Sequence, residues 1–161
     1  MAVTTQKSSE YTNVTAVPAV NVGPSEHHGR VRQMFFTHAQ AGAGDATSSV
    51  ALGKLPGGKV RLLASQSKAY VNWTTASATL DLGWDAYTDP DGNAVAADSD
   101  GIDDGINVDT AGFQTFGSIL TATGGTKVFE SKDGVVIRAT SQSTAIADGD
   151  DLVGYLLYVV D

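Results

Sequence analysis

Residues 77–84, SATLDLGW, alternate polar and apolar side chains, and this alternation constrains the local structure more than any other segment. Ala78, Leu80, Leu82 and Trp84 fall on one face of an extended backbone, and the residues between them fall on the other. A period of two is typical of a strand with one face in a core and one in solvent. We therefore predict a half-buried β-strand here.

Other strand-like segments recur along the chain, separated by turn sequences. They are RVRQMFFTHA at 30–39, SSVALGKL at 48–55, KVRLLASQSKAYVNW at 59–73 with a break near 65–67, KVFES at 127–131, VVIRATS at 135–141 and LVGYLLYVV at 152–160. The Asp133–Gly134 turn indicates a hairpin. The last segment is apolar on both faces, as in a strand at the centre of a sandwich or against a partner. Residues 109–120, DTAGFQTFGSIL, carry an aspartate at an N-cap position and predict a short helix.

The composition favours an all-β domain. The chain has 161 residues, of which 18 are glycine and only 17% are charged. Residues that long helices favour are scarce, whereas valine, threonine and aromatic residues with glycine-rich turns favour sheets. Short strands with turns at fairly regular intervals are typical of sandwiches. We predict one domain over residues 29–161, an antiparallel β-sandwich or jelly roll.

Residues 1–28 differ from the rest of the chain. They are polar, are interrupted by Pro18 and Pro24, and show neither strand alternation nor a helical period. We predict an extended N-terminal arm. Its apolar residues recur at intervals, which favours docking on a neighbouring subunit over a free terminus, although a free terminus remains the alternative.

The chain lacks the residues and motifs of most catalytic and cofactor sites. It has no cysteine, which excludes thiol catalysis and cysteine-bound zinc, and it contains no G-x-S-x-G, H-E-x-x-H or phosphate-binding-loop sequence. The net charge of −8 disfavours nucleic acid, which requires clustered lysine and arginine. No apolar run approaches the roughly 20 residues of a membrane span. We expect no enzyme activity, no catalytic residues, no cofactor, and neither a nucleic-acid nor a membrane partner.

An acidic stretch occupies residues 89–105, DPDGNAVAADSDGIDDG, and the wider segment 81–109 holds nine acidic and no basic residues. Calcium prefers such oxygen ligands, and Asp98, Asp100 and Asp103 form the one candidate set. Their spacing matches no EF-hand loop, and Asp-Gly sequences are ordinary turn chemistry. We therefore predict a solvated loop without a metal.

Four passages together resemble small bacteriophage structural proteins that are encoded near the major capsid protein. They are EYTNVTAVPAVNVGPSEHHGRVR, VALGKLPGGKVRLLAS, LDLGWDAYTDPDGNAVAADSDGID and KVFESKDGVVIRATSQSTAIADGDDLVGYLLYVVD. The resemblance spans nearly the whole chain, and its most characteristic part is the terminal hairpin followed by a hydrophobic strand. It implies a component of a virus particle.

Within that group, the leading hypothesis is a capsid decoration, or cement, protein. It would be made in the bacterial host cytoplasm and would bind the major capsid protein on the outer surface of the mature head, as a homotrimer at three-fold positions. The arm residues expected to contact the shell are Tyr11, Val14, Val17, Val20 and Val22. The residues expected at the subunit interface are Phe35, Phe36, Trp73, Tyr155 and Tyr158.

Two alternatives remain open. One is a tail-associated or receptor-binding virion module, in which Trp73, Trp84 and Tyr87 would stack on host glycan. The other is a free-standing lectin-like domain. Against the first, Trp84 falls on the apolar face of the alternating strand, and no repetitive shaft or coiled coil occurs.

Overall fold

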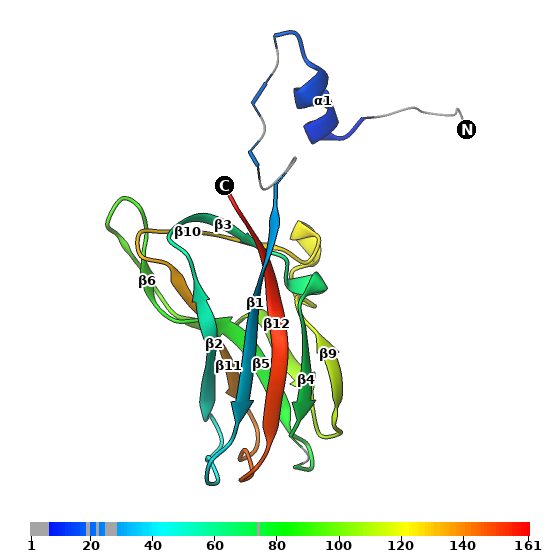
Figure 1. Ribbon diagram of the computed structural model, residues 1–161, viewed down its shortest axis with the longest axis vertical. Coiled ribbons are helices and arrows are strands. Elements are labelled where there is room, and N and C mark those ends of the chain that lie inside the picture. Colours follow the sequence, from blue (N-terminus) through cyan, green and yellow to red (C-terminus); the bar gives the residue numbers. More distant parts are fainter. Residues whose placement is uncertain (1–6, 19, 22, 25–28, 74) are drawn as a thin grey trace, which may run out of the picture.

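The strands of the computed structural model form two facing sheets (Figure 1), and the structure describes residues 7–18, 20–21, 23–24, 29–73 and 75–161. The strands are β1 (Val31–Ala39), β2 (Ser49–Leu55), β3 (Gly58–Leu62), β4 (Lys68–Asn72), β5 (Thr79–Trp84), β6 (Tyr87–Thr88), β7 (Ala94–Val95), β8 (Asp98–Asn107), β9 (Gly112–Thr115), β10 (Lys127–Ser131), β11 (Val135–Ser141) and β12 (Asp151–Val160). The predicted all-β antiparallel sandwich is confirmed.

The strands pair in a nested order along the chain. β1 pairs with β12, β2 with β11, β4 with β9 and β5 with β8, all antiparallel. One sheet therefore contains the order β1-β12-β4-β9, and the other has the order β2-β11-β5-β8. Eight strands rolled up in this way form a jelly roll. β3 and β10 extend the first sheet, and β6 and β7 form a separate small hairpin.

β12 takes the central position in the larger sheet, as its apolar sequence predicts. One of its edges pairs with β1 along its length. Its other edge is shared end to end, because residues 151–155 pair with β4 and residues 158–160 pair with β3. Every position along this strand thus has a neighbour on at least one side. β1 is left at the border of the sheet with β12 as its partner strand.

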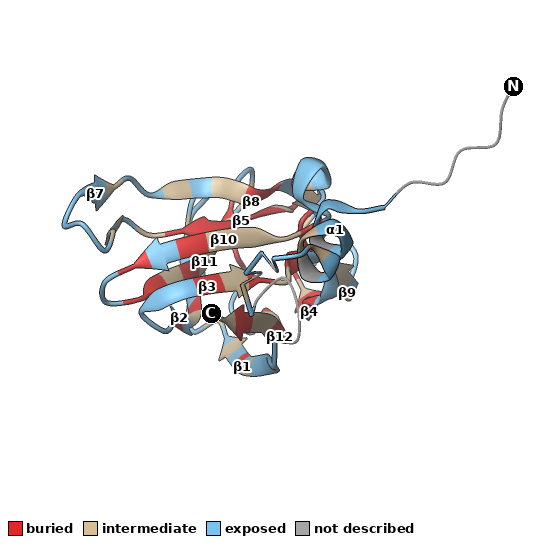
Figure 2. Ribbon diagram, turned by 90° about the horizontal axis from the view of Figure 1, so that it is seen from above, coloured by how far each residue is buried: buried red, intermediate tan, exposed pale blue. Residues whose placement is uncertain are grey.

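The core lies between the two sheets, where Figure 2 shows buried residues on strands of both layers. The predicted inward residues of β5 are buried, and Leu80 and Leu82 are 0% exposed. Trp84 packs edge-on against Phe129, with ring centroids 5.3 Å apart. Each fully buried leucine or valine stabilises the fold by about 1.5–3 kcal/mol relative to an exposed position.

The other face of the alternating segment is not solvated as predicted. Asp81 is only 3% exposed and Gly83 is buried. The cause is β8, whose register against β5 shifts twice, so its backbone bulges over this face. A Cβ atom at Gly83 would come within 1.9 Å of the Asp98 carbonyl oxygen, which shows how closely the two strands approach.

The helix predicted over residues 109–120 is wrong. The structure has β9 there, followed by a 3-10 turn at Thr121–Thr123. Phe113 pairs with Tyr70 of β4, and their rings meet edge to face at 5.4 Å. Pairing with an existing sheet outweighs a weak local capping signal, because most of the stability of a short segment comes from tertiary contacts.

The arm is not extended throughout, which corrects the prediction. Helix α1 (Ser9–Thr15) is capped by the Ser8 hydroxyl, which accepts a hydrogen bond from the Tyr11 amide at 3.1 Å. Ala16 returns to an extended backbone conformation. Figure 1 shows α1 beyond the end of the sandwich, away from both sheets. The side chain of Val14, and the whole of Val22, lie outside the described residues.

Candidate interaction surface

A row of aromatic and aliphatic side chains crosses the outer face of the sheet that contains β1, β12, β4 and β9. Strand alternation sends every second residue outward. Phe35 lies opposite Tyr155, Val153 lies opposite Tyr70, and Tyr70 lies opposite Phe113. Because partners in antiparallel strands share a face, these residues form one continuous apolar row.

The row lines a hollow of about 600 Å³. Its walls come from Phe35, Tyr70, Phe113, Val153 and Tyr155, with Lys68 at the rim. Phe35 is 63% exposed and Phe113 is 78% exposed, so large apolar rings face solvent. A hollow of this size accommodates a small ligand or several side chains of a partner. Contiguous exposed apolar surface of this kind is typical of an interaction site.

The backbone of Gly154 also lines the hollow. A Cβ atom there would come within 2.2 Å of the Lys68 carbonyl oxygen and 2.9 Å of Cζ of Phe36. Only glycine therefore permits β12 and β4 to approach so closely at this position. A side chain here would point toward the core side, where the partners of Gly154 are Phe36 and Ala69.

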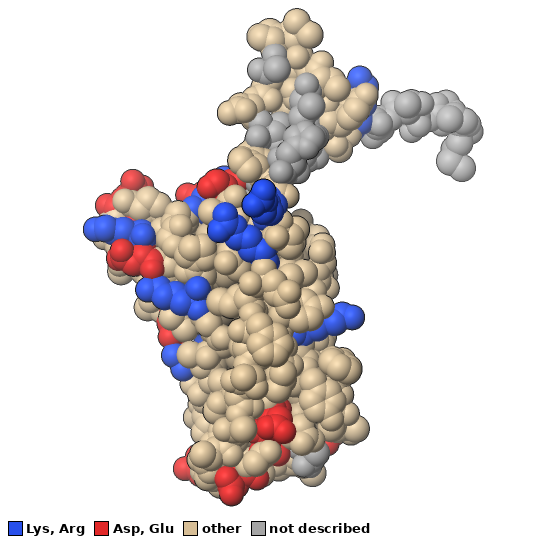
Figure 3. All heavy atoms as spheres, in the orientation of Figure 1, with Lys and Arg blue, Asp and Glu red and all other residues tan. Residues whose placement is uncertain are grey.

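The face around the hollow is nearly uncharged. Figure 3 shows it toward the viewer, with a broad middle free of Lys, Arg, Asp and Glu and with charged side chains at its borders. Lys68 is the only charged residue among the described residues that line the hollow. The chain as a whole has a net charge of −8, so this neutral area differs from its average surface. It fits an apolar partner rather than a phosphate.

The predicted interface residues are placed in different parts of the fold. Phe35 and Tyr155 line the hollow, and Tyr158 is half-buried against the core. Phe36 is 6% exposed and Trp73 is 1% exposed, so both lie inside the sandwich. Of these five residues, Phe35 and Tyr155 face the hollow and can contact a partner there.

Sequence reasoning missed Tyr70 and Phe113, which complete the hollow. The signal for Tyr70 is present in KAYVN, where Ala69 and Val71 face the core and Tyr70 faces outward. Phe113 alternates in the same way within GFQT. Its segment had been predicted as a helix, which hid this alternation.

The described arm residues carry exposed apolar side chains. Tyr11 is 55% exposed, Val17 is 98% exposed and Val20 is 50% exposed. The base of the arm packs on the end of β12. A Cβ atom at Gly23 would lie 3.3 Å from the Asp161 carboxylate, and one at Gly29 would lie 2.5 Å from Val159.

The first half of the acidic stretch is a hairpin. Asp89, at the start of the turn between β6 and β7, accepts hydrogen bonds from the Asn93 amide at 2.7 Å and from the Asn93 side chain at 2.9 Å. These bonds hold the pKa of the Asp89 carboxyl below its usual value. Together they close the turn, which is the ordinary role of aspartate at such a position.

The second half, residues 98–105, is strand β8 rather than the predicted solvated loop. Ile102 and Asp103 are both 0% exposed. The Asp103 carboxylate accepts hydrogen bonds from the Gly117 amide at 2.5 Å, the Ser118 amide at 3.3 Å and the Ser118 hydroxyl. Asp103 thus holds the loop that follows β9. Amide and hydroxyl donors occupy the positions around its carboxylate that a metal ion would need.

The three calcium candidates do not form one cluster. Asp98 interacts with Asp100, and burial together with that neighbouring carboxyl raises the pKa of Asp98. Asp103 is committed to Gly117 and Ser118. Among the described residues, no group of three or more acidic or histidine side chains is arranged to hold a metal ion.

Asp81 is a second buried acid in this sheet. It accepts a hydrogen bond from the Gly105 amide at 2.8 Å. Burial raises its pKa, and the charges of Asp104 and Asp100 add to that increase, while the Gly105 bond opposes it. These acids therefore repel one another across β5 and β8.

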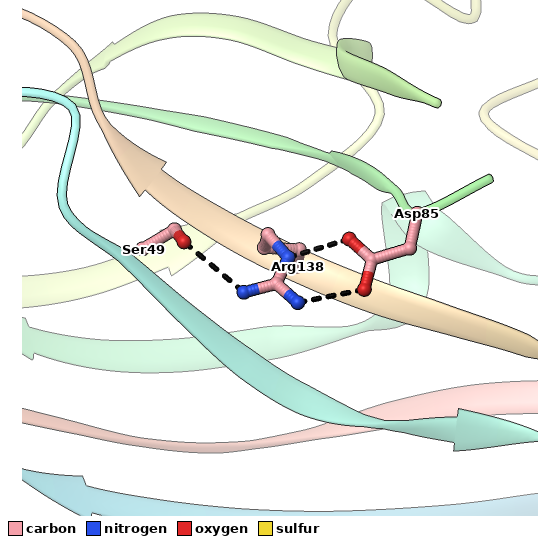
Figure 4. A network of polar contacts seen from close by, with 3 residues as sticks. All are labelled: Ser49, Asp85 and Arg138. Atoms are coloured by element: carbon pink, nitrogen blue, oxygen red, sulfur yellow. Dashed lines mark hydrogen bonds and ion pairs between the residues drawn. The ribbon is translucent and has the colours of Figure 1, made fainter. Parts of the chain in front are cut away.

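A polar network on the same sheet has a structural role (Figure 4). The Arg138 guanidinium of β11 donates to both oxygens of Asp85 at 2.5 and 2.6 Å, and also to the Ser49 hydroxyl of β2 at 3.1 Å. The paired guanidinium holds the pKa of Asp85 below its usual value. The network links β2, β11 and the end of β5, and both partners of the ion pair are about one-third exposed.

The residues considered for glycan stacking are mostly inside the fold. Trp73 is 1% exposed and Trp84 is 8% exposed. The Trp84 indole nitrogen donates to the Ala96 carbonyl oxygen at 3.2 Å, and the Lys127 ammonium lies 4.4 Å from its ring centroid. Tyr87 is half-buried beside Phe129.

In the part of the chain that the structure describes, no helix is long and apolar enough to cross a membrane.

The sequence matches no family model and no curated protein, but the structure is similar to solved viral structures. A chain of the infectious bursal disease virus VP2 subviral particle has a TM-score of 0.51 and 9% identity, over 83% of this chain and 33% of that chain. A chain of the cyanophage Pam1 capsid asymmetric unit has a TM-score of 0.49 and 14% identity, over 91% of this chain and 97% of that chain. This chain spans about a third of the bursal disease virus chain, and the two share a fold.

Proposed function

We propose that the protein is a decoration subunit on the outer surface of a virus head. It would be made in the cytoplasm of a bacterial host and would bind the major capsid protein as a homotrimer. The observation that carries this proposal is the uncovered apolar hollow on a neutral face of the jelly roll. Such a face is built to be covered by another protein surface.

The fold supports the proposal. The jelly roll is an architecture of viral capsid domains, and this chain shares it with a chain of a viral particle, the VP2 subviral particle. A projecting arm with exposed Tyr11, Val17 and Val20 adds a second adhesive element. This arm would contact the shell or a neighbouring subunit, as extended segments commonly do.

The role would be mechanical rather than catalytic. A subunit that binds the mature, expanded shell and not its precursor stabilises the expanded state by mass action. Each bound copy would add its binding free energy to the stability of the junction between capsid subunits. The hollow offers one lysine and two tyrosine hydroxyls as polar groups, which suits contact with an apolar surface.

The apolar lining of the hollow disfavours glycan recognition at this site. A sugar needs several hydrogen-bond partners in addition to an aromatic platform. Tyr70 and Phe113 meet edge to face, so they do not present one flat stacking surface. A host-glycan role would require another site, and the buried Trp73 and Trp84 do not supply it.

Co-sedimentation of the purified protein with mature and precursor shells tests the proposal. Saturable binding to mature shells, in multiples of three copies per symmetry-related site, is expected. Phe113→Ser should weaken that binding, whereas Ala94→Ser on the exposed β6–β7 hairpin should not. Absence of binding to either shell, with binding on a glycan array, would instead indicate a receptor-binding module.

A further inference from the structure

We infer that the hollow is the receptor for the arm of a second copy of this chain, which places its exposed Tyr11, Val17 and Val20 against the ring-lined hollow. This inference rests on the proposed homotrimer and identifies the contact that would hold it together. Both surfaces belong to the described chain, and both are uncovered. Their chemistry matches, since aromatic and aliphatic side chains face solvent on each.

Helix α1 is too short to be stable without a partner. It has seven residues, and isolated helices shorter than about 12–15 residues are marginal in water. Its capping bond and the Thr15 hydroxyl bond to the Tyr11 carbonyl oxygen are both internal to the arm. A helix of this length forms when an apolar surface packs against it. Among the described residues of the body, the hollow is an apolar surface of the size that such packing needs.

Charge supports the same partner. The arm has no charged residue from position 11 to position 25, and the hollow has Lys68 alone. Two copies of a chain with a net charge of −8 repel one another. Contact between two neutral surfaces keeps the acidic regions of the copies away from the interface.

The position of the arm favours exchange between copies. Its base is held at the end of β12 by the close approach of Gly23 to Asp161 and of Gly29 to Val159. At this base, Val31 of β1 pairs with Val159. The hollow begins at Phe35, which lies four residues beyond Val31, or about 13 Å at strand spacing. Figure 1 shows α1 on the other side of this base from the sheets. An arm would have to reverse at its anchored base to fill its own hollow, whereas a neighbour's hollow requires no reversal.

Single-cysteine cross-linking tests this contact, because the chain has no native cysteine. One variant carries Val17→Cys on the arm and the other carries Thr115→Cys at the rim, where Thr115 pairs with Lys68. Both positions are exposed, so the substitutions leave the fold intact. The full-length variants are mixed without any shell and treated with a short bis-maleimide linker. Covalent dimers that contain one chain of each variant are counted by mass spectrometry.

The matched control replaces Thr115→Cys with Ala94→Cys, which is exposed on the β6–β7 hairpin outside the hollow. Mixed dimers should form several-fold more with Thr115→Cys than with Ala94→Cys. Phe113→Ser, added to the Thr115→Cys chain, should return the yield to the control level. Equal yields with both partners would overturn the inference, and so would linkage within a single chain in a Val17→Cys/Thr115→Cys double variant.

Light scattering gives an independent measurement. The wild-type chain should have the mass of an oligomer, and Phe113→Ser should have the mass of one chain. A wild-type monomer across the accessible concentration range would contradict arm exchange. If, in a parallel reaction with mature shells added, Val17→Cys links to the shell protein and not to Thr115→Cys, the arm binds the shell instead. The inference then fails while the proposed decoration role stands.

Discussion

Phe35 of β1 lies directly opposite Tyr155 of β12, and both side chains face out of the sandwich into the hollow. The next residue, Phe36, lies opposite Gly154 and points into the core. Two adjacent phenylalanines therefore serve different purposes. One is 63% exposed and available to a partner, and the other is 6% exposed and packs the interior.

Alanine at each of these two positions should separate binding from stability. Phe36→Ala should lower the free energy of unfolding by about 3–5 kcal/mol, because it opens a core cavity. Phe35→Ala should lower it by less than about 1 kcal/mol, since only a cross-strand pair is lost. Urea unfolding measures both changes in stability. For Phe35→Ala, the oligomer mass measured by light scattering, or the affinity for the shell, should also decrease. Equal destabilisation by the two variants would contradict the assignment of their faces.

Deletion of residues 1–28 should leave the sandwich folded. The described bonds of α1 lie within the arm, and its base touches the body near Asp161 and Val159. The melting temperature of residues 29–161 should therefore remain within a few degrees of the full chain, as calorimetry would show. Shell binding should be lost. Undiminished affinity for the shell would refute a role for the arm.

Gly154→Ala should destabilise the protein more than its small size suggests. The added Cβ atom would meet the Lys68 carbonyl oxygen at 2.2 Å, so β4 and β12 would have to separate. Overpacking of this kind costs about 1–3 kcal/mol. Gly112→Ala on β9 is the matched control, because its nearest neighbour would be 3.8 Å away. Chemical denaturation of the two variants compares them, and similar midpoints would contradict this account.

Asp103 should be essential to the loop after β9 without any metal. Asp103→Ala leaves the Gly117 and Ser118 donors without an acceptor and should cost about 1–3 kcal/mol or more. Asp103→Asn keeps one acceptor oxygen and should cost less. Calcium or a chelator should leave the melting temperature of the wild-type protein unchanged. A clear decrease with chelator would show that the acidic segment binds an ion.

The parts of the fold that the sequence predicts are those where local pattern and tertiary environment agree. The inward face of β5, the turn at Asp133–Gly134 and the central place of β12 all follow from alternation or turn chemistry. The hairpin predicted at that turn is wrong, because β10 pairs with β3 in one sheet while β11 pairs with β2 and β5 in the other. The strand structure and burial of the acidic segment could not be predicted in this way. Two register shifts carry β8 over β5 and bury Asp81 and Asp103. Bulges depend on the pairing of strands far apart in sequence, which no local pattern encodes.

The candidate site was only half visible in the sequence for a similar reason. Phe35 and Tyr155 were expected at an interface, but the hollow also needs Tyr70 and Phe113. These four residues come from four strands, and the jelly-roll order places them side by side. Phe36 and Trp73 were grouped with them because alternation alone does not tell which face of a strand meets the core when both faces are apolar.

The pH dependence of stability should contain two opposing contributions from the same sheet. Arg138 lowers the pKa of Asp85 in the folded protein. Asp85 therefore adds stability above its unfolded pKa of about 3.9, and this is lost as the pH falls through the folded value. Asp98 has a raised pKa, first from burial and then from Asp100. The folded protein keeps the Asp98 proton to a higher pH than the unfolded chain does. Stability therefore falls as the pH rises from about 3.9 through that raised value.

Two amide variants should separate these contributions in melting curves recorded between about pH 3 and pH 7. Asp98→Asn should gain stability relative to the wild type as the pH rises, because it removes a charge that burial, and then Asp100, disfavours. Asp85→Asn should lose stability relative to the wild type over the same rise, because the ion pair with Arg138 is absent. Salt should reduce the second difference, since the pair is about one-third exposed. Differences that stay constant with pH would show that neither carboxyl has a shifted pKa.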